Sequence, residues 1–179
     1  MRGRPHRIWS ATKVEIVAKK YLDSVYRVAV NYSKNIQDAG DAVQNAFLKL
    51  LKTDMVFSDE EHIRRWLIKV TINECKSFWR KLSRHSTSSL DELYANGYEP
   101  LAASQGEYNT ADRARELLDA VMHLPAKYSI VVHLYYYEGY SVEEISKMVG
   151  ISKSNVQIRL MRGRTKLKES LEETNYDGK

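Results

Sequence analysis

The sequence predicts an all-α protein of two small helical domains joined by a flexible linker, and three observations support this fold class. Apolar residues recur at spacings of three and four, as on amphipathic helices, and no segment alternates as strands do. This pattern fails from His85 and resumes at Thr110. The length of 179 residues suits one ordinary domain or two small ones. We expect domains at residues 10–84 and 110–172, with a linker at 85–109.

Three helices are expected in the N-terminal domain, because three apolar stripes follow one another. They span residues 14–32, 43–51 and 63–82. In the third stripe, Trp66, Leu67 and Val70 are expected to face the core. A helix that buries one apolar stripe needs a neighbour to cover it, so the three helices should pack together.

Capping side chains mark where the second and third helices begin. Asp38 is expected to cap the second helix. The third is expected to start near Asp59, with Ser58 as its cap, Glu61 closing a capping box and Phe57 as the apolar residue before the cap.

The linker segment differs in composition from both of its neighbours. It is rich in Ser, Gly, Asn and acids, with a proline at Pro100 and one helical turn expected around residues 90–94. A segment of this length inside one compact domain would be unusual, so it favours two domains.

The charges fall into a basic, an acidic and a basic block. The net charge is +5 and the isoelectric point about 9.2, which is typical of a protein with a polyanionic partner. Cations dominate residues 62–85 and 152–168, and the second range contains no acid. Between them, residues 86–112 carry acids but neither Lys nor Arg. This partition indicates two surfaces for nucleic acid.

Composition argues against several other classes. Mean hydropathy is −0.51, no apolar run is long enough for a bilayer, and no apolar segment follows the basic N-terminus as in a secretion signal. The single Cys75 allows neither an internal disulfide nor a thiolate zinc cluster. Phosphate loops, paired acid and base residues and activated nucleophiles are lacking, which argues against an enzyme. We expect a cytoplasmic protein without metal, cofactor or small-molecule substrate.

The C-terminal domain contains two short helical patterns that meet at a glycine. Pro125 starts the preceding helix and Gly139 ends it. Ser141 and Glu144 form a capping box, and Gly150 suits a left-handed C-cap. Two short helices with a glycine at the corner form a helix-turn-helix, whose second helix enters the DNA major groove. A solvated basic surface helix is the alternative.

The second of these helices is expected to contact duplex DNA. Its first turn offers hydroxyls and amides, which suit base edges, and cations follow. The expected contacts are Ser152, Lys153, Ser154, Asn155, Gln157, Arg159 and Arg162.

These stretches resemble a known family. Residues 124–171, "LPAKYSIVVHLYYYEGYSVEEISKMVGISKSNVQIRLMRGRTKLKESL", are similar to region four of bacterial RNA polymerase sigma factors of the extracytoplasmic-function group, in the sigma-70 family. "DAGDAVQNAFLKLL" and "HIRRWLIKVTINECKSFWRK" resemble region two. The chain departs from the pattern at Gly40 and Asn45, where Glu is common, which puts the polymerase contact in doubt. It also departs at Gln157 and Gly163, where Lys and Ala are frequent, with an expected effect on promoter preference.

The resemblance implies a sigma factor that binds core RNA polymerase through its β and β′ subunits and places it at promoter DNA. The helix-turn-helix would read the minus-35 element, and an anti-sigma protein is an implied partner. The implied polymerase contacts are Asp41, Gln44, Asn45 and Leu48. The implied minus-ten contacts are Phe57, Arg64, Arg65, Lys69, Asn73, Lys76 and Arg80.

Several alternatives stay open from the sequence. Phe57 serves either as a helix staple or as the wall of a pocket for an unpaired base. The acidic linker either enters the RNA path of the polymerase or is an ordinary tether. A conventional helix-turn-helix regulator, with an N-terminal domain that senses a ligand or dimerises, is the alternative function. The second basic helix and the polymerase-binding motif favour the sigma factor.

Overall fold

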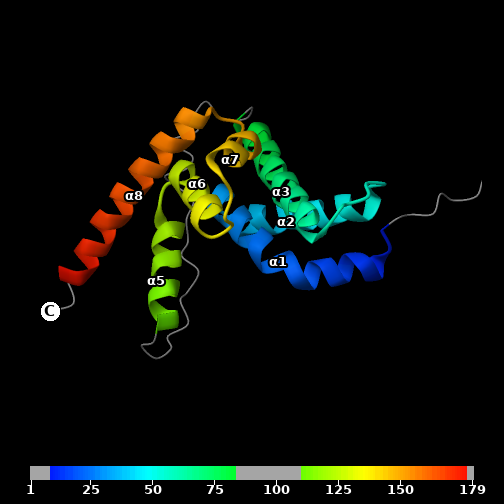
Figure 1. The fold of residues 1–179 in the computed structure, drawn as a ribbon, viewed down its shortest axis with the longest axis horizontal. Coiled ribbons are helices and arrows are strands. Elements are labelled where there is room, and N and C mark those ends of the chain that lie inside the picture. The colour runs from blue at the N-terminus through cyan, green and yellow to red at the C-terminus, as the bar shows by residue number, and fades with distance from the viewer. Residues whose placement is uncertain (1–8, 84–109, 177–179) are drawn as a thin grey trace, which may run out of the picture.

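The computed structural model describes residues 9–83 and 110–176, and within these ranges every regular element is an α-helix, as predicted (Figure 1). The basic head and the predicted linker with its helical turn lie outside the described residues. None of the described helices combines the length and apolarity needed to cross a bilayer.

The N-terminal half consists of α1 (Ala11–Ser33), α2 (Ile36–Lys52) and α3 (Glu60–Ser83), each of which contacts the other two. On α3 the buried side chains include Leu67, Ile68 and Ile72, whereas Trp66 and Val70 are only half-buried. The predicted core position of Leu67 is therefore confirmed, and Trp66 packs against the core cluster while half-buried. Helix α3 also contacts α7, so part of its surface faces the C-terminal half.

Both predicted helix caps in this half were wrong by one to three residues. Asn35 caps α2, because its side chain accepts the N–H of Asp38 at 3.0 Å. Asp38 instead lies in the first turn, where its charge suits the helix dipole. At α3 the carboxylate of Asp59 accepts the N–H of His62 at 2.7 Å, and the Ser58 hydroxyl donates to that carboxylate at 2.9 Å.

The C-terminal half is built around a buried helix. It consists of α5 (Thr110–His123), α6 (Ala126–Tyr136), α7 (Val142–Val149) and α8 (Lys153–Tyr176). Helix α6 lies at the centre, because it contacts α5, α7 and α8 and also α1 of the other half. Most of its residues are buried for this reason.

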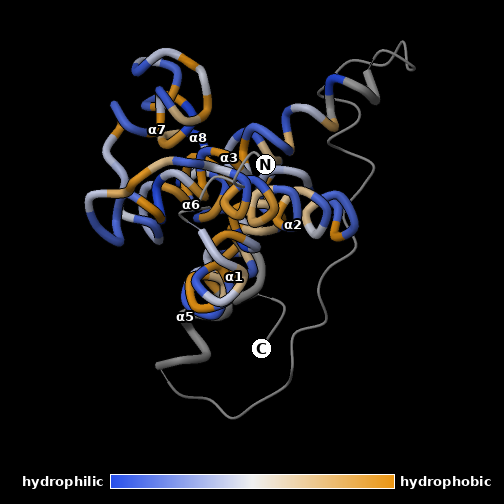
Figure 2. The backbone as a smooth tube through the Cα atoms, turned by 90° about the vertical axis from the view of Figure 1, so that its right-hand side faces the viewer, coloured by the Kyte–Doolittle hydropathy of each residue, from blue (hydrophilic) through white to orange (hydrophobic). Residues whose placement is uncertain are grey.

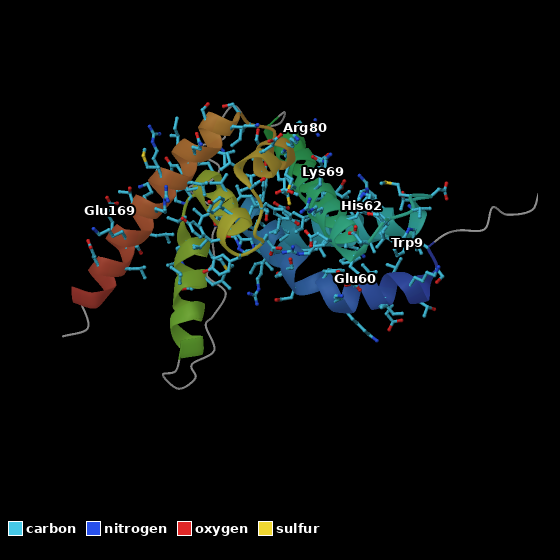
Figure 3. All side chains as sticks on the ribbon, viewed as in Figure 1. Trp9, Glu60, His62, Lys69, Arg80 and Glu169 are labelled. Atoms are coloured by element: carbon cyan, nitrogen blue, oxygen red, sulfur yellow. The ribbon has the colours of Figure 1, made fainter. Side chains whose placement is uncertain are left out.

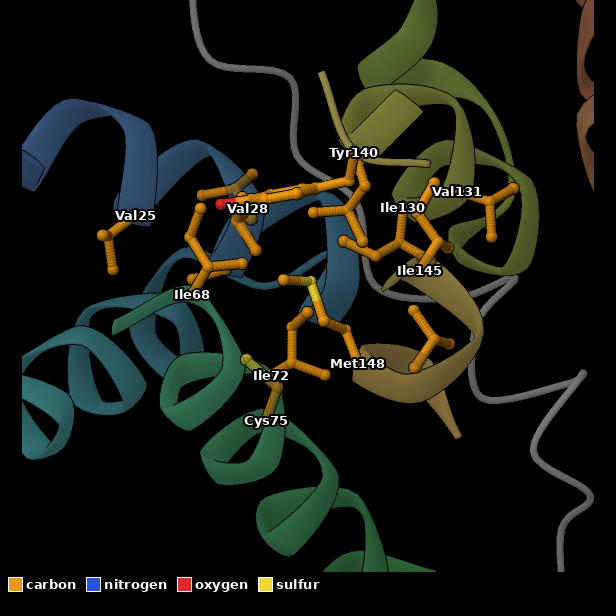
Figure 4. Packing of buried hydrophobic residues seen from close by; sticks show 14 of the residues in the cluster. Val25, Val28, Ile68, Ile72, Cys75, Ile130, Val131, Tyr140, Ile145 and Met148 are labelled. Atoms are coloured by element: carbon orange, nitrogen blue, oxygen red, sulfur yellow. The ribbon is translucent and has the colours of Figure 1, made fainter. Parts of the chain in front are cut away.

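One hydrophobic cluster spans the two halves. Apolar segments gather where α1, α2, α3 and α6 come together (Figure 2). In close view, Tyr140 reaches from the start of α7 toward Val28 on α1 and Ile68 on α3 (Figure 4). Ile130 and Met148 face the same cluster from α6 and α7. The helices predicted as two domains therefore pack against each other in this structure.

Gly163 lies at a close contact between α8 and α6. A Cβ atom at this position would lie 2.8 Å from Cγ2 of Val132, closer than side chains pack. This departure from the family pattern thus lies at a helix–helix contact, on the buried side of α8.

Gly163→Ala is expected to lower the free energy of unfolding by about 1 kcal/mol. Overpacking costs about 1–3 kcal/mol, and the higher helix propensity of alanine returns at most about 1 kcal/mol. Gly40→Ala is a matched control inside α2, where a Cβ would meet nothing within 4 Å, so it should raise stability by about 0.5–1 kcal/mol. Urea unfolding measures both, and a shift of the same sign for the two variants would contradict the packing argument.

Candidate nucleic-acid interface

Helices α7 and α8 form the predicted helix-turn-helix, and its predicted caps are confirmed. Ser141 Oγ accepts the N–H of Glu144 at 3.3 Å, and the Glu144 carboxylate accepts the N–H of Ser141 at 2.9 Å. Gly150 adopts the left-handed conformation at φ +76°. Ser152 Oγ accepts the N–H of Asn155 at 3.2 Å, which fixes the start of α8.

The structure brings the predicted minus-35 contacts together at the cap and the first three turns of α8. The exposed members are Ser152, Lys153, Ser154, Gln157 and Arg162. Asn155 and Arg159 are half-buried, and Nε of Arg159 donates to Oδ1 of Asn155 at 2.9 Å. This hydrogen bond holds the Arg159 guanidinium along the flank of the helix.

Two exposed apolar residues, which were not among the predicted contacts, lie between these candidates on α8. Ile158 is 45% exposed and Met161 55% exposed. They share a helix face with Ser154, at spacings of four and three, and this spacing was the available signal.

Helix α3 exposes one part of the predicted minus-ten set. Lys69, Asn73 and Arg80 are exposed and spaced by four and seven residues, so they share one face. Figure 3 shows Lys69 and Arg80 along the same side of α3. A row of cations and an amide on one helix face suits a nucleic-acid strand.

Phe57 lies in an aromatic cluster. Its ring packs edge-on against Trp9, His62 and Trp66, with centroid distances of 5.5, 5.1 and 5.6 Å. Trp9 is anchored in turn, since its Nε1 donates to the carbonyl of Met55 at 3.1 Å. With Asp59 as the cap of α3, Phe57 lies two residues before the cap, so it is not the helix staple that the sequence predicted. Its role in a base pocket remains a prediction.

The other predicted minus-ten cations contact the C-terminal half of the same chain. Arg64 donates to the carboxylate of Glu138 and, at 3.2 Å, to its carbonyl. Arg65 pairs with Glu144 at 2.8 Å. Lys76 donates to the carbonyl of Met148, also at 3.2 Å. These three side chains therefore bridge the halves, and of the three Arg65 keeps a side chain that is 49% exposed.

Glu138 is the centre of this bridge. Its side chain is 5% exposed, and both carboxylate oxygens accept from Ser24 Oγ, at 2.9 and 2.8 Å. Nε2 of His133 lies 3.4 Å from Oε1. Burial alone would raise the pKa of Glu138, but the nearby His133 imidazole, the hydrogen bonds from Ser24 and the charge of Arg64 lower it below its ordinary value. The group is thus an ionised carboxylate shared by α1, α3 and the C-terminal half.

A second bridge forms where α1 ends. Lys34 adopts the left-handed conformation at φ 55°, which is rare for a residue with a side chain. Its buried ammonium donates to the carbonyl of Met122 at 2.6 Å and to Ser129 Oγ at 2.8 Å. Ser129 also donates to Asn31 on α1. Burial lowers the pKa of Lys34 to about 7.

The predicted polymerase contacts lie on one stripe of α2. Asp41 and Gln44 are exposed, Leu48 is 43% exposed, and Asn45 is half-buried. An exposed carboxylate, an amide and an apolar side chain within two helical turns form a surface that suits a basic partner helix.

Comparisons with known proteins agree with this arrangement. The description "Sigma-70 region 2" matches residues 17–85, and "Sigma-70, region 4" matches residues 114–167. The chain is 30% identical to RNA polymerase sigma factor SigV of Bacillus subtilis over 139 residues, which cover 76% of this chain and 78% of SigV. It is 26% identical to ECF RNA polymerase sigma factor SigM of Mycobacterium tuberculosis over 149 residues, or 83% of this chain and 72% of SigM.

Two solved structures have a similar fold. The sigma factor RpoE of Bartonella quintana, in complex with the anti-sigma factor NepR, aligns with a TM-score of 0.65 and 21% identity over 90% of this chain and 98% of RpoE. CnrH, in complex with the cytosolic domain of CnrY, aligns with a TM-score of 0.53 and 18% identity over 91% of this chain and 90% of CnrH.

Proposed function

Because the chain belongs to the extracytoplasmic-function group of the sigma-70 family, we propose that it binds core RNA polymerase in the cytoplasm and directs promoter-specific transcription initiation, with no catalytic chemistry of its own. The observation that carries this proposal is the pairing of a helix-turn-helix in one half with the exposed stripes of α2 and α3 in the other. We assign residues 10–84 to region 2 and 110–172 to region 4.

Each surface then has its own partner. The first turns of α8 bind the minus-35 duplex, and the Lys69–Asn73–Arg80 face of α3 binds the minus-ten element. The Asp41–Gln44–Leu48 stripe binds the polymerase. The exposure of these side chains supports this assignment of three surfaces to three partners. Each surface can be contacted by its partner while the other two are also bound.

The described arrangement is a closed form of this sigma factor. Arg64, Arg65 and Lys76 are bound to the C-terminal half, so the complete minus-ten surface forms when the halves separate. RpoE was solved with the anti-sigma factor NepR, which supports an anti-sigma partner here too. Such a partner inhibits by binding the closed form more tightly than the open one.

Changing Asp41 and Gln44 together to alanine should weaken binding to core RNA polymerase by about tenfold or more, as expected for exposed anchors at the centre of an interface. Fluorescence titration of the labelled chain with core polymerase measures this. Asp23→Ala is the charge-matched control on α1, where the carboxylate is 77% exposed and pairs with Arg27 in its own helix. Unchanged polymerase affinity in the double variant would remove α2 from the proposed interface.

A further inference from the structure

We infer that Ile158 and Met161 contact thymine methyl groups in the minus-35 duplex and thereby help to determine promoter specificity. The inference rests on the proposed function and deepens it, since it names the feature of the DNA that these side chains recognise.

Ile158 and Met161 lie on the face of α8 that points away from the rest of the C-terminal half. Val156, Leu160 and Leu167 are buried against the rest of the C-terminal half. With 100° between successive residues of a helix, Ile158 projects almost opposite this buried line. The exposed line is Ser154, Ile158, Met161 and Thr165, at spacings of four, three and four. Ile158 and Met161 therefore occupy the middle of the face that a major groove would meet.

The charge of the surroundings carries the second step. Single exposed apolar side chains are common and need no explanation. Here, Ile158 and Met161 are adjacent on the helix surface and lie between cationic and hydroxyl side chains. Residues 152–168 contain no acid. Arg162 and Arg164 are exposed one helical turn from Ile158 and Met161, so this face suits a polyanion. Lys153 lies on another side of the helix, where it pairs with Glu143 of α7 at 3.1 Å. Duplex DNA is the partner that this charge pattern fits.

The chemistry of the groove carries the third step. The floor of the major groove presents hydrogen-bond donors and acceptors, and the C5-methyl of thymine is its apolar feature. An isoleucine side chain forms no hydrogen bonds and the methionine thioether is only a weak acceptor, so the main favourable contact of either side chain in the groove is this methyl. Burial of one such group changes affinity by about fourfold.

The test removes the methyl from the DNA instead of changing the fold of the protein. The full chain with core polymerase first selects minus-35 sequences from a random duplex library. Each thymine of the selected site is then replaced by deoxyuridine, and affinities are measured for the unchanged chain, for Ile158→Ala and for Met161→Ala. Ile16→Ala on α1 is the control, since Ile16 is a 64% exposed apolar residue far from α8 in the sequence.

The unchanged chain and the Ile16→Ala control should lose about fourfold in affinity at one or two thymines, the effect of one methyl group. For Ile158→Ala or Met161→Ala, replacing the contacted thymine by deoxyuridine should cause no further loss of affinity, because the side chain that contacts the methyl is already absent. An equal deoxyuridine penalty in all four proteins, no penalty at any position, or a selected site without thymine would overturn the inference and leave the sigma-factor function standing. Selection of no sequence at all would overturn both.

Discussion

Glu138→Ala is expected to open the closed form and to raise affinity for the minus-ten element. The Glu138 carboxylate joins Ser24 and Arg64 across the halves, and its side chain is 5% exposed. Loss of one partner from a buried, hydrogen-bonded charge pair costs about 2–5 kcal/mol. Because this contact lies between the halves, its loss destabilises the closed form relative to the open form. The stability of each separate half should stay the same.

Two measurements on Glu138→Ala monitor the separation of the halves. Energy transfer between dyes placed in the two halves should fall, and affinity for DNA with an open minus-ten bubble should rise by about tenfold or more, since 1.4 kcal/mol corresponds to a factor of ten. The rise has a direct cause, because Arg64 and its neighbours become available to the strand.

The control separates opening from a simple change of net charge. Glu15→Ala removes the same charge from α1, where that carboxylate pairs with Lys19 and is 64% exposed. It should leave both the dye distance and the bubble affinity near their original values. Equal gains in DNA affinity for Glu15→Ala and Glu138→Ala would mean that the bridge does not restrain the minus-ten surface.

The buried amine of Lys34 is expected to make stability rise with pH. Its pKa is about 7 in the folded chain and near 10.5 in an exposed lysine, so the unfolded state binds more protons between these values. Stability is therefore lost as the pH falls from 10.5 toward 7 and changes little below that. From pH 7 to 8.5 the free energy of unfolding should rise by about 1.5 kcal/mol.

Lys34→Met isolates this contribution, because methionine keeps much of the length and removes the titrating group. The difference in unfolding free energy between the unchanged chain and Lys34→Met should grow over this pH range in urea titrations. Lys147→Met, at a side chain 72% exposed, should show no such difference. Below pH 8.5 the Cys75 thiol has little effect on this difference. Burial raises its pKa from 9.0 to about 12, so it lowers stability mainly above pH 9, where the unfolded thiol ionises. Identical pH slopes for the unchanged chain and Lys34→Met would show that the hydrogen bonds to Met122 and Ser129 keep the ammonium charged when folded.

The helix-turn-helix was predictable because its signals are local. The capping box of Ser141 and Glu144, the left-handed Gly150 and the cap at Ser152 each join residues that are close in sequence. These turns can therefore be predicted from nearby side chains, without knowledge of any tertiary contact. The position of the minus-35 candidates at the start of α8 follows from the same local caps, whereas their contacts with DNA remain a prediction.

The contacts between the halves could not be predicted in this way. Arg64 and Glu138 are 74 residues apart, and Ser24 and Glu138 are 114 apart. In the sequence, Arg64 resembles Lys69, since both are cations on one helix. The structure distinguishes them, because the first is paired across the halves and the second is exposed. Such pairings depend on tertiary packing, which leaves no periodic signal.

Promoter-specific transcription tests the central claim most directly. Core RNA polymerase of the encoding bacterium is incubated with fragments of its genome, with and without the purified chain, and the 5′ ends of the transcripts are sequenced. The sigma-factor function predicts discrete start sites that need the chain and share two upstream elements, one at minus ten and one at minus 35. Failure to bind core polymerase or to create start sites, together with binding of a symmetric dimer to a palindromic operator, would contradict it and identify a conventional regulator.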